Sequence, residues 1–305
     1  MTEPAPSIEH TGPVGEPVVS LRGISKSFGA VRALDAVDLD IFSGEVVAIV
    51  GDNGAGKSTL VKILAGVHPQ DSGTISFEGK EVSIPSPSES RALGVATVFQ
   101  DLALCDNLDV VSNLFLGHEM GGFTLKEEEM EKRSWELLQQ LSAKIPSVRI
   151  AVASLSGGQR QTVAIARSLI GEPAVVILDE PTAALGVAQT AEVLNLVERL
   201  RERGLGVVII SHNMADVQAV ADRVVVLRLG RNNGDFMVAD VSYEDIIAAI
   251  TGASDNAVTR RASAQTSLSK ADSTQPRGPQ PDDRGDGPGA DPAISRYSTE
   301  EGQQL

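Results

Sequence analysis

The chain has 305 residues, with 26 Lys or Arg against 41 Asp or Glu, so its formal net charge is −15. An acidic balance argues against nucleic-acid binding and against docking on anionic lipid, because both need basic clusters. Its longest aliphatic runs are five or six residues, far short of the about 20 that a membrane-spanning helix needs. The single cysteine, Cys105, excludes an internal disulfide, and one Cys with four His argues against a structural zinc site.

Composition divides the chain into three parts. Residues 1–17 hold four prolines and two glycines, which predict a flexible leader. They do not show the basic region followed by an apolar stretch that is typical of a secretory signal. Residues 253–305 are rich in Pro, Gly and Asp and poor in large apolar residues, so we expect this tail to be disordered. The predicted folded unit is therefore residues 18–252, a single domain.

Hydrophobic patterns within this unit predict strands of two kinds. Apolar residues alternate with polar ones at Val37, Leu39 and Ile41, and again at Ile75 and Phe77, as in half-buried antiparallel strands. Continuous aliphatic runs, typical of strands covered on both faces of a parallel sheet, occupy Val46–Val50, Ala174–Leu178, Val207–Ile210 and Val224–Leu227.

Helical patterns lie between these strands, at Thr59–Ala65, Leu125–Leu141, Gln159–Ile170, Val187–Arg203 and Met214–Ala221. Alternation of strand and helix predicts an α/β fold with a parallel-sheet core, and the early alternating strands predict an attached antiparallel β subdomain. The stretch 101–154 has no strong strand pattern, which predicts a mostly helical insert.

The first chemical signal is a phosphate loop. Residues 51–59 read GDNGAGKST, which is the G-x-x-x-x-G-K-[ST] pattern between an apolar strand and a helix. Its glycines let backbone N–H groups point inward as an anion nest, and the following helix directs its positive end at the same phosphates. Lys57 would place its charge on the β- and γ-phosphates, Ser58 can ligate Mg²⁺, and Thr59 can support the phosphates. The alternative is a chance match, which the strand–loop–helix context disfavours.

A pair of carboxylates supports this prediction. The strand ending Ile177-Leu178 is followed by Asp179 and Glu180, and carboxylates at this end of a parallel strand lie beside the phosphate loop. Asp179 can hold Mg²⁺ through water, and Glu180 can orient and deprotonate the attacking water. Taken alone, the two acids could equally be a charged strand end that caps the next helix, a reading that Pro181 supports.

A second glycine motif, LSGGQ at residues 155–159, precedes a helical run. Ser156 is a good N-cap, and Gly157 and Gly158 expose backbone N–H groups at a helix start. The residues alone leave two interpretations open, an ordinary helix cap or a second anion site.

LSGGQ placed between the phosphate loop and ILDE resembles the signature motif of the ATP-binding cassette (ABC) ATPases. Gln100 in ATVFQD is similar to the family's Q-loop glutamine, and His212 in VVIISHNM to its switch histidine. Phe28 in KSFGAVRAL is similar to the aromatic residue that stacks on adenine. Taken singly, Phe28 could be core, His212 an N-cap and Gln100 a surface amide. The resemblance covers about residues 18–252.

The resemblance implies a P-loop cassette with a helical subdomain at about 101–154, which binds ATP and Mg²⁺. It implies catalytic roles for Lys57, Glu180 as general base and His212 as γ-phosphate sensor, and Mg²⁺ ligation by Ser58, Gln100 and Asp179. The implied nucleotide contacts are Phe28, Gly51, Asp52, Asn53, Gly54, Ala55, Gly56, Lys57, Ser58, Thr59, Gln100, Ser156, Gly157, Gly158 and Gln159.

The resemblance also implies partners. In this family two cassettes pair head to tail, so that the signature of one chain binds the γ-phosphate held by the other. A single cassette implies a homodimer or pairing with another cassette chain. Membrane permease subunits and, indirectly, a sugar-binding protein would complete the assembly at the cytoplasmic face of the membrane.

One departure from the family pattern is Gly186, which stands where a D-loop aspartate is usual. The run PTAALGVAQT, with SHNMADVQAVADRVVVLRLGR, resembles the ATPases of ribose- and xylose-type monosaccharide importers. The expected function is therefore to energise sugar uptake by ATP hydrolysis. The alternative is a non-transport cassette ATPase acting as a mechanical module, although the long coiled coils and basic arms usual in that class are missing from this sequence.

Overall fold

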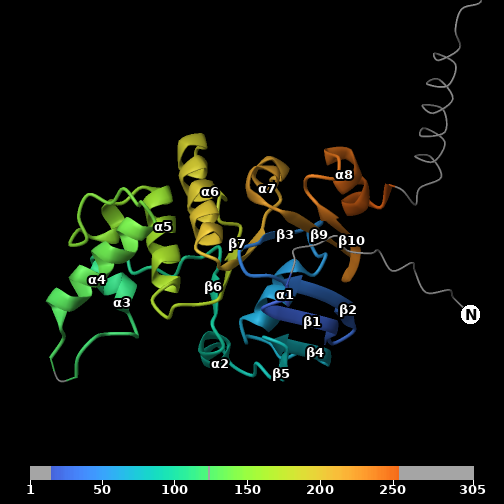
Figure 1. Cartoon of the computed structure of the whole chain (residues 1–305), viewed down its shortest axis with the longest axis horizontal. Coiled ribbons are helices and arrows are strands. Elements are labelled where there is room, and N and C mark those ends of the chain that lie inside the picture. The colour runs from blue at the N-terminus through green and yellow to red at the C-terminus, as the bar shows by residue number, and fades with distance from the viewer. Residues whose placement is uncertain (1–14, 123, 254–305) are drawn as a thin grey trace, which may run out of the picture. The chain divides into compact units, whose positions relative to one another are not determined.

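The computed structural model describes residues 15–122 and 124–253 (Figure 1). Most of the predicted leader and nearly all of the predicted tail lie outside these residues. The strands are β1 (Val19–Phe28), β2 (Val31–Ile41), β3 (Val46–Val50), β4 (Ser72–Phe77), β5 (Lys80–Val82), β6 (Val95–Val98), β7 (Val175–Asp179), β8 (Gly206–Ile210), β9 (Arg223–Arg228) and β10 (Arg231–Met237). The α-helices are α1 (Lys57–Leu64), α2 (Pro87–Ala92), α3 (Val110–Phe115), α4 (Glu127–Gln140), α5 (Gly157–Ser168), α6 (Val187–Glu202), α7 (Met214–Val220) and α8 (Tyr243–Thr251).

A six-stranded sheet in the order β10-β9-β3-β8-β7-β6 forms the centre of the described fold. Strands β9, β3, β8, β7 and β6 are parallel, and β10 adds antiparallel to β9 at one edge. All five residues of β3 are buried, because the sheet is covered on both faces, as the continuous aliphatic run predicts.

Alternate residues of β3 face two different hydrophobic cores. Val46, Ala48 and Val50 join a core built with α3 to α8, whereas Val47 and Ile49 join a core built with α1 and a second sheet. That second sheet is antiparallel, with strand order β2-β1-β4-β5. Figure 1 shows α1 lying among the blue strands of this side, away from the green α3, α4 and α5.

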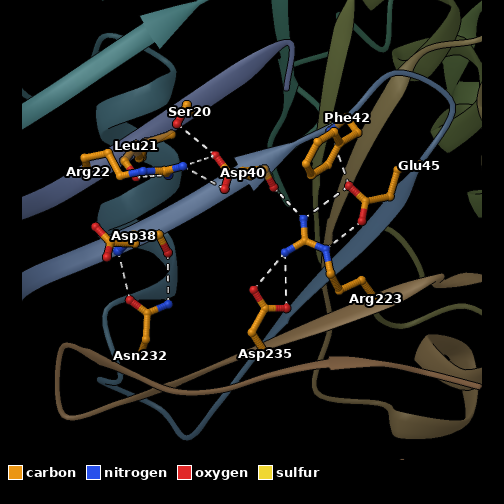
Figure 2. A network of polar contacts seen from close by, with 10 residues as sticks. All are labelled: Ser20, Leu21, Arg22, Asp38, Asp40, Phe42, Glu45, Arg223, Asn232 and Asp235. Carbon is orange, nitrogen blue, oxygen red and sulfur yellow. Dashed lines mark hydrogen bonds and ion pairs between the residues drawn. The ribbon is translucent and has the colours of Figure 1, made fainter. Parts of the chain in front are cut away.

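A buried arginine joins the two sheets (Figure 2). Arg223 at the start of β9 donates to both oxygens of Glu45, at 2.6 and 3.2 Å, and to the Asp40 carbonyl of β2 at 2.6 Å. Its Nη1 also donates to the Asp235 carboxylate of β10, at 3.0 Å. Because the guanidinium is almost fully buried, loss of one partner would leave an uncompensated buried charge, which typically costs about 3–5 kcal/mol. The network therefore holds β2 against β9 and β10.

The expected elements are present, and the structure adds others. Strand β2 begins at Val31, six residues before the alternating pattern that predicted it, and the 101–154 stretch contains α3, α4 and a short 3₁₀ helix. The sequence patterns did not predict β1, β5, β6, β10, α2 or α8. Strands β1 and β10 escape the pattern because they carry bulges and many polar residues.

Candidate functional site

The expected catalytic residues follow strands that are neighbours in the central sheet. The phosphate loop follows β3, His212 lies just beyond β8, Glu180 directly follows β7, and Gln100 lies just beyond β6. Since β3, β8, β7 and β6 are parallel and adjacent, their carboxyl ends meet at one edge of the sheet, where α/β proteins bind ligands.

The phosphate loop has a backbone that only glycine permits at two points. Gly51 has φ +148, and a Cβ there would lie 2.1 Å from the Leu227 carbonyl oxygen. Gly56 caps α1 with φ +105, and a Cβ there would lie 2.7 Å from the Ala33 carbonyl oxygen. The loop therefore packs directly on neighbouring backbone, and at Gly56 the residue conformation itself requires glycine.

Lys57 opens α1 with its side chain folded back over the loop. Its Nζ donates to the carbonyl oxygens of Gly51 and Asp52, at 2.6 and 3.0 Å. Burial lowers the pKa of this ammonium, while Glu180, Asp52 and Asp179 partly offset the shift. The positive charge is thus held within the loop, near Asp52 of the loop itself and near Asp179 and Glu180 at the end of β7, two strands away in the sheet.

The two adjacent carboxylates, Asp179 and Glu180, lie at the end of β7. Burial, and then the negative charge of Glu180, raise the pKa of Asp179, and Lys57 and Lys62 only partly oppose this. Glu180 adopts φ +51, an unusual left-handed conformation, and its backbone N–H donates to the Ile210 carbonyl of β8 at 2.9 Å. The left-handed conformation of Glu180 therefore interrupts the regular alternation of side chains along the strand.

Glu180 and His212 form a direct contact that links β7 and β8. The Glu180 Oε2 lies 2.8 Å from His212 Nδ1. The Glu180 side chain is 17% exposed and that of His212 is 75% exposed. A shielded carboxylate is therefore oriented by an imidazole that faces solvent, which is the arrangement expected of a general base and its positioning partner.

Phe28 lies at the end of β1, is 44% exposed as a residue and belongs to neither core, so the alternative of a plain core residue is wrong. Its ring meets that of His68 edge to face, with centroids 5.3 Å apart at 71°. Lys26 Nζ lies 5.7 Å from the Phe28 ring centroid and forms an ion pair with Asp71 at 2.7 Å. The sequence patterns did not single out His68, because its partner lies 40 residues earlier in the chain.

The signature residues begin α5. Ser156 is its N-cap and accepts a hydrogen bond from the Gln159 N–H at 3.3 Å. The Gln159 side chain accepts from the Ser156 N–H at 3.0 Å and donates to the Lys144 carbonyl at 2.8 Å. Both ends of the Gln159 amide are therefore engaged within the chain, so this side chain supports the loop. The open interpretation of a helix cap is confirmed for Ser156, and its N-terminal geometry is also that of an anion site.

The structure does not bring the signature and the phosphate loop together within one chain. The buried residues of α1 belong to the core on one face of the central sheet, and those of α5 belong to the core on the other. Figure 1 shows the two helices well separated. The helices that follow the two glycine motifs therefore pack on opposite faces of the central sheet.

The segment between Glu180 and α6 holds the departure from the family pattern. Gly186 is the N-cap of α6 without a side chain to cap it, and its N–H donates to Gln189 Oε1 at 3.4 Å. Upstream, Thr182 Oγ1 donates to the Asp216 carboxylate of α7 at 2.6 Å. Leu185 packs so closely on the signature that a Cβ on Gly157 would lie 2.9 Å from its Cδ2.

Comparison with known proteins identifies the family of the chain. The ABC transporter family matches residues 34–183. The chain belongs to this family and is a nucleotide-binding ATPase of the ABC type.

Its relatives include sugar import proteins. The chain is 47% identical over 215 residues to the xylose/arabinose import ATP-binding protein XylG of Sulfolobus acidocaldarius, covering 70% of this chain and 86% of that protein. It is 44% identical over 247 residues to the fructose import ATP-binding protein FrcA of Rhizobium meliloti, covering 78% and 95%. It is 39% identical to the ribose import ATP-binding protein RbsA of Yersinia pestis, and this match covers 77% of this chain but only 46% of that protein.

Solved structures support the same fold. A nucleotide-free ATP-binding cassette from an ABC transporter aligns with TM-score 0.68 at 28% identity, covering 77% of this chain and 95% of that one. A dimeric post-hydrolysis state of the cassette MJ0796, bound to ADP and Pi, aligns with TM-score 0.62 at 27% identity, covering 72% and 98%. Within the described part of this chain, no helix is both long and apolar enough to cross a membrane.

Proposed function

We propose that this chain is the ATP-hydrolysing subunit of a monosaccharide importer, acting on a separate membrane permease at the cytoplasmic face. Its ATPase domain would occupy residues 18–252, with the helical subdomain at about 101–154. The 2.8 Å contact between Glu180 and His212, beside the phosphate loop, is the observation that carries the hydrolytic part. The choice of a sugar rests on the identity to xylose/arabinose and fructose import proteins.

ATP would bind with its adenine against the exposed face of Phe28 and its phosphates in the loop of residues 51–56. Lys57 would exchange its two backbone acceptors for β- and γ-phosphate oxygens, which are stronger acceptors because they are charged. Thr59 lies in the first turn of α1, where the positive helix end adds to the attraction.

The residues beside the loop fit a magnesium ion. The Ser58 hydroxyl is exposed in the first turn of α1, and Asp179 is a partly buried carboxylate whose pKa is raised beside Glu180. A cation would relieve this repulsion, and Mg²⁺ favours one or two carboxylates combined with substrate phosphates and water. Ser58, Asp179 and Gln100 would hold it, and bound there it would neutralise charge on the β- and γ-phosphates.

Hydrolysis would follow from the position of Glu180. Its carboxylate would orient a water molecule and accept a proton as the water oxygen bonds to the γ-phosphorus and the bond to the ADP oxygen breaks. His212, which contacts the same carboxylate, would donate to the γ-phosphate. Lys57 would stabilise the charge that spreads over the phosphate oxygens.

The γ-phosphate would also complete a dimer. Because α1 and α5 pack in cores on opposite faces of the central sheet, a second cassette would supply Ser156, Gly157 and Gly158 to each nucleotide. A homodimer with two equivalent sites is the simplest closed arrangement. ATP would then favour the closed state and its hydrolysis the open one.

The test is sugar uptake in the cell of origin. A deletion of the gene should abolish uptake of one labelled monosaccharide among xylose, arabinose, ribose and fructose, and the wild-type gene should restore it. The Glu180→Gln variant should fail to restore uptake although it accumulates normally. Uptake of an unrelated amino acid is the control. Unchanged uptake of all four sugars after deletion would refute the sugar assignment.

A further inference from the structure

The turn between β9 and β10 lies against the outside of the phosphate loop. It consists of Leu229 and Gly230, with φ +49 and +79. The Gly230 N–H donates to the Ala55 carbonyl of the phosphate loop at 3.1 Å, and the Gly230 carbonyl accepts from the Asp35 N–H of β2 at 2.8 Å. One residue therefore bonds both the loop and the neighbouring β2 strand.

No room remains between these three segments. A Cβ on Gly230 would lie 2.8 Å from the Ala33 carbonyl oxygen and 3.3 Å from the Leu34 Cα. A Cβ on Gly56 would lie 2.7 Å from the same Ala33 oxygen and 3.6 Å from the Gly230 Cα. Leu34 Cδ2 also lies 2.7 Å from the Gly56 Cβ position, but the Ala33 oxygen that both glycines face is backbone. A methyl group at either glycine could therefore be accommodated only if the loop or β2 moved.

The loop needs a support at this point. When its N–H groups turn inward to bind phosphate, some of its carbonyl groups turn outward, and each needs a hydrogen-bond donor. For Ala55, a buried residue, Gly230 is that donor. The side chain of Arg231, which follows, forms an ion pair with Asp35 and ties the same turn to β2 a second time.

We propose that Gly230 is a positioning residue for ATP binding, which fixes the outward side of the phosphate loop so that its N–H groups face the phosphates. The inference rests on the proposed nucleotide role of this loop. It assigns a part in nucleotide affinity to the β9–β10 turn, more than 170 residues along the chain from the loop, through a glycine that has no side chain.

Gly230→Ala tests the proposal, with Gly79→Ala as a matched control. Gly79 lies in the β4–β5 turn at φ +73, so the control imposes a similar backbone strain, but its Cβ would meet only the Glu16 carboxylate at 4.0 Å. Binding of ATP and of inorganic triphosphate is titrated on folded protein well below each melting temperature. We expect Gly230→Ala to raise the Kd of both ligands at least tenfold and Gly79→Ala to change neither.

The outcomes separate the two proposals. If Gly230→Ala lowers the melting temperature as Gly79→Ala does but keeps the wild-type Kd, the turn has a structural role alone and the inference is wrong. If the wild-type chain binds neither ATP nor triphosphate, the proposed function fails first.

Amide hydrogen exchange on the wild-type chain supplies a test that needs no variant. Coupling is reciprocal, so a turn that favours nucleotide binding must itself be stabilised by bound nucleotide. The reference amide is that of Glu78 in the β4–β5 turn, which donates to the Val18 carbonyl at 2.8 Å. With saturating ADP, exchange of the Gly230 and Asp35 amides should slow at least threefold more than exchange of this reference amide. Equal slowing at all three amides would overturn the inference.

Discussion

Glu180 shows how one backbone angle arranges the chemistry of the site. In a regular strand, Asp179 and Glu180 would point to opposite faces. The left-handed conformation of Glu180 breaks this alternation and carries its carboxylate to His212. Such a conformation costs of the order of 1 kcal/mol for a residue with a side chain. The hydrogen bond from its N–H to Ile210 helps to offset that cost.

Asp179 lowers the stability of the fold that it serves. Its pKa in the folded chain is raised, first by burial and then by Glu180, so the folded state binds more protons than the unfolded state between the ordinary and the raised value. The free energy of unfolding therefore falls as pH rises through that window, and the ionised carboxylate stays destabilising above it.

Asp179→Asn should therefore raise the melting temperature at pH 7 while it lowers ATPase activity. The gap from the wild type should shrink as pH falls toward the ordinary aspartate pKa of 3.8. Thermal unfolding without nucleotide or magnesium, at pH 7 and pH 5, measures this. Asp240→Asn, at an exposed position, is the control for a lost surface charge. A lower melting temperature for Asp179→Asn at pH 7 would contradict the argument.

His68 should affect binding of the adenine of ATP and not binding of its phosphates. Its edge-to-face contact orients the Phe28 ring, and aromatic pairs of this kind contribute about 0.5–1.5 kcal/mol. His68→Ala should therefore raise the Kd for ATP about twofold to tenfold and leave that for inorganic triphosphate unchanged. His118→Ala, a change of the same kind in the helical part of the chain, should alter neither. Equal weakening of both ligands by His68→Ala would show that the histidine acts through the loop.

At the scale of single elements, the accuracy of the sequence prediction follows burial. Strands β3, β7, β8 and β9 were predicted because both their faces are covered and their sequences are continuously aliphatic. Strand β10 reads RNNGDFM, and no local pattern marks it as a strand. It forms because β9 offers a partner edge and because Asn232 exchanges two hydrogen bonds with the backbone of Asp38, both at 2.9 Å.

The site divides in the same way. Lys57, Asp179 and Glu180 could be proposed as site residues from the sequence because each lies in a short motif tied to one strand end. The contact of Glu180 with His212 could not, since it depends on β7 and β8 being neighbours in the sheet. The contact of His68 with Phe28 similarly depends on how the segment after α1 packs beside β1. Sequence spacing alone carries no information about either pair.

The N-cap of helix α6 is Gly186, which has no side chain to cap the helix. Gly186 has an extended N-cap backbone, φ −75 and ψ 163, and a Cβ there would meet nothing within 4 Å. An aspartate would accept a hydrogen bond from the first turn and place a negative charge at the positive helix end.

Gly186→Asp should therefore raise the free energy of unfolding of the isolated chain by about 0.5 kcal/mol. Urea unfolding followed by circular dichroism measures the change. Gly171→Asp is the matched control, because its Cβ also meets nothing within 4 Å but it follows α5 and caps no helix start. If Gly186→Asp loses as much free energy of unfolding as Gly171→Asp does, the segment before α6 does not accept a side chain.

For the whole molecule, the central sheet determines how many chains a nucleotide needs. The sheet separates two cores, with α1 in one and α5 in the other. The helices that begin at Lys57 and just after Ser156 are each anchored in a different one of these cores. If both residues serve one nucleotide, two chains must share it, and a symmetric pair then has two such sites.

Mixing two inactive variants tests this sharing. Lys57→Ala removes the phosphate-loop charge, and Ser156→Asp keeps an N-cap for α5 while facing the γ-phosphate of the partner with a negative charge. Each homodimer has two defective sites, but a mixed dimer has one site with both defects and one intact site. Because random pairing makes about half of the dimers mixed, the mixture should recover up to about a quarter of wild-type ATPase activity. Ser156→Asn, which caps α5 without a charge, should lose less activity alone than Ser156→Asp does. A mixture no faster than the mean of its two components would show that each chain hydrolyses ATP with its own residues.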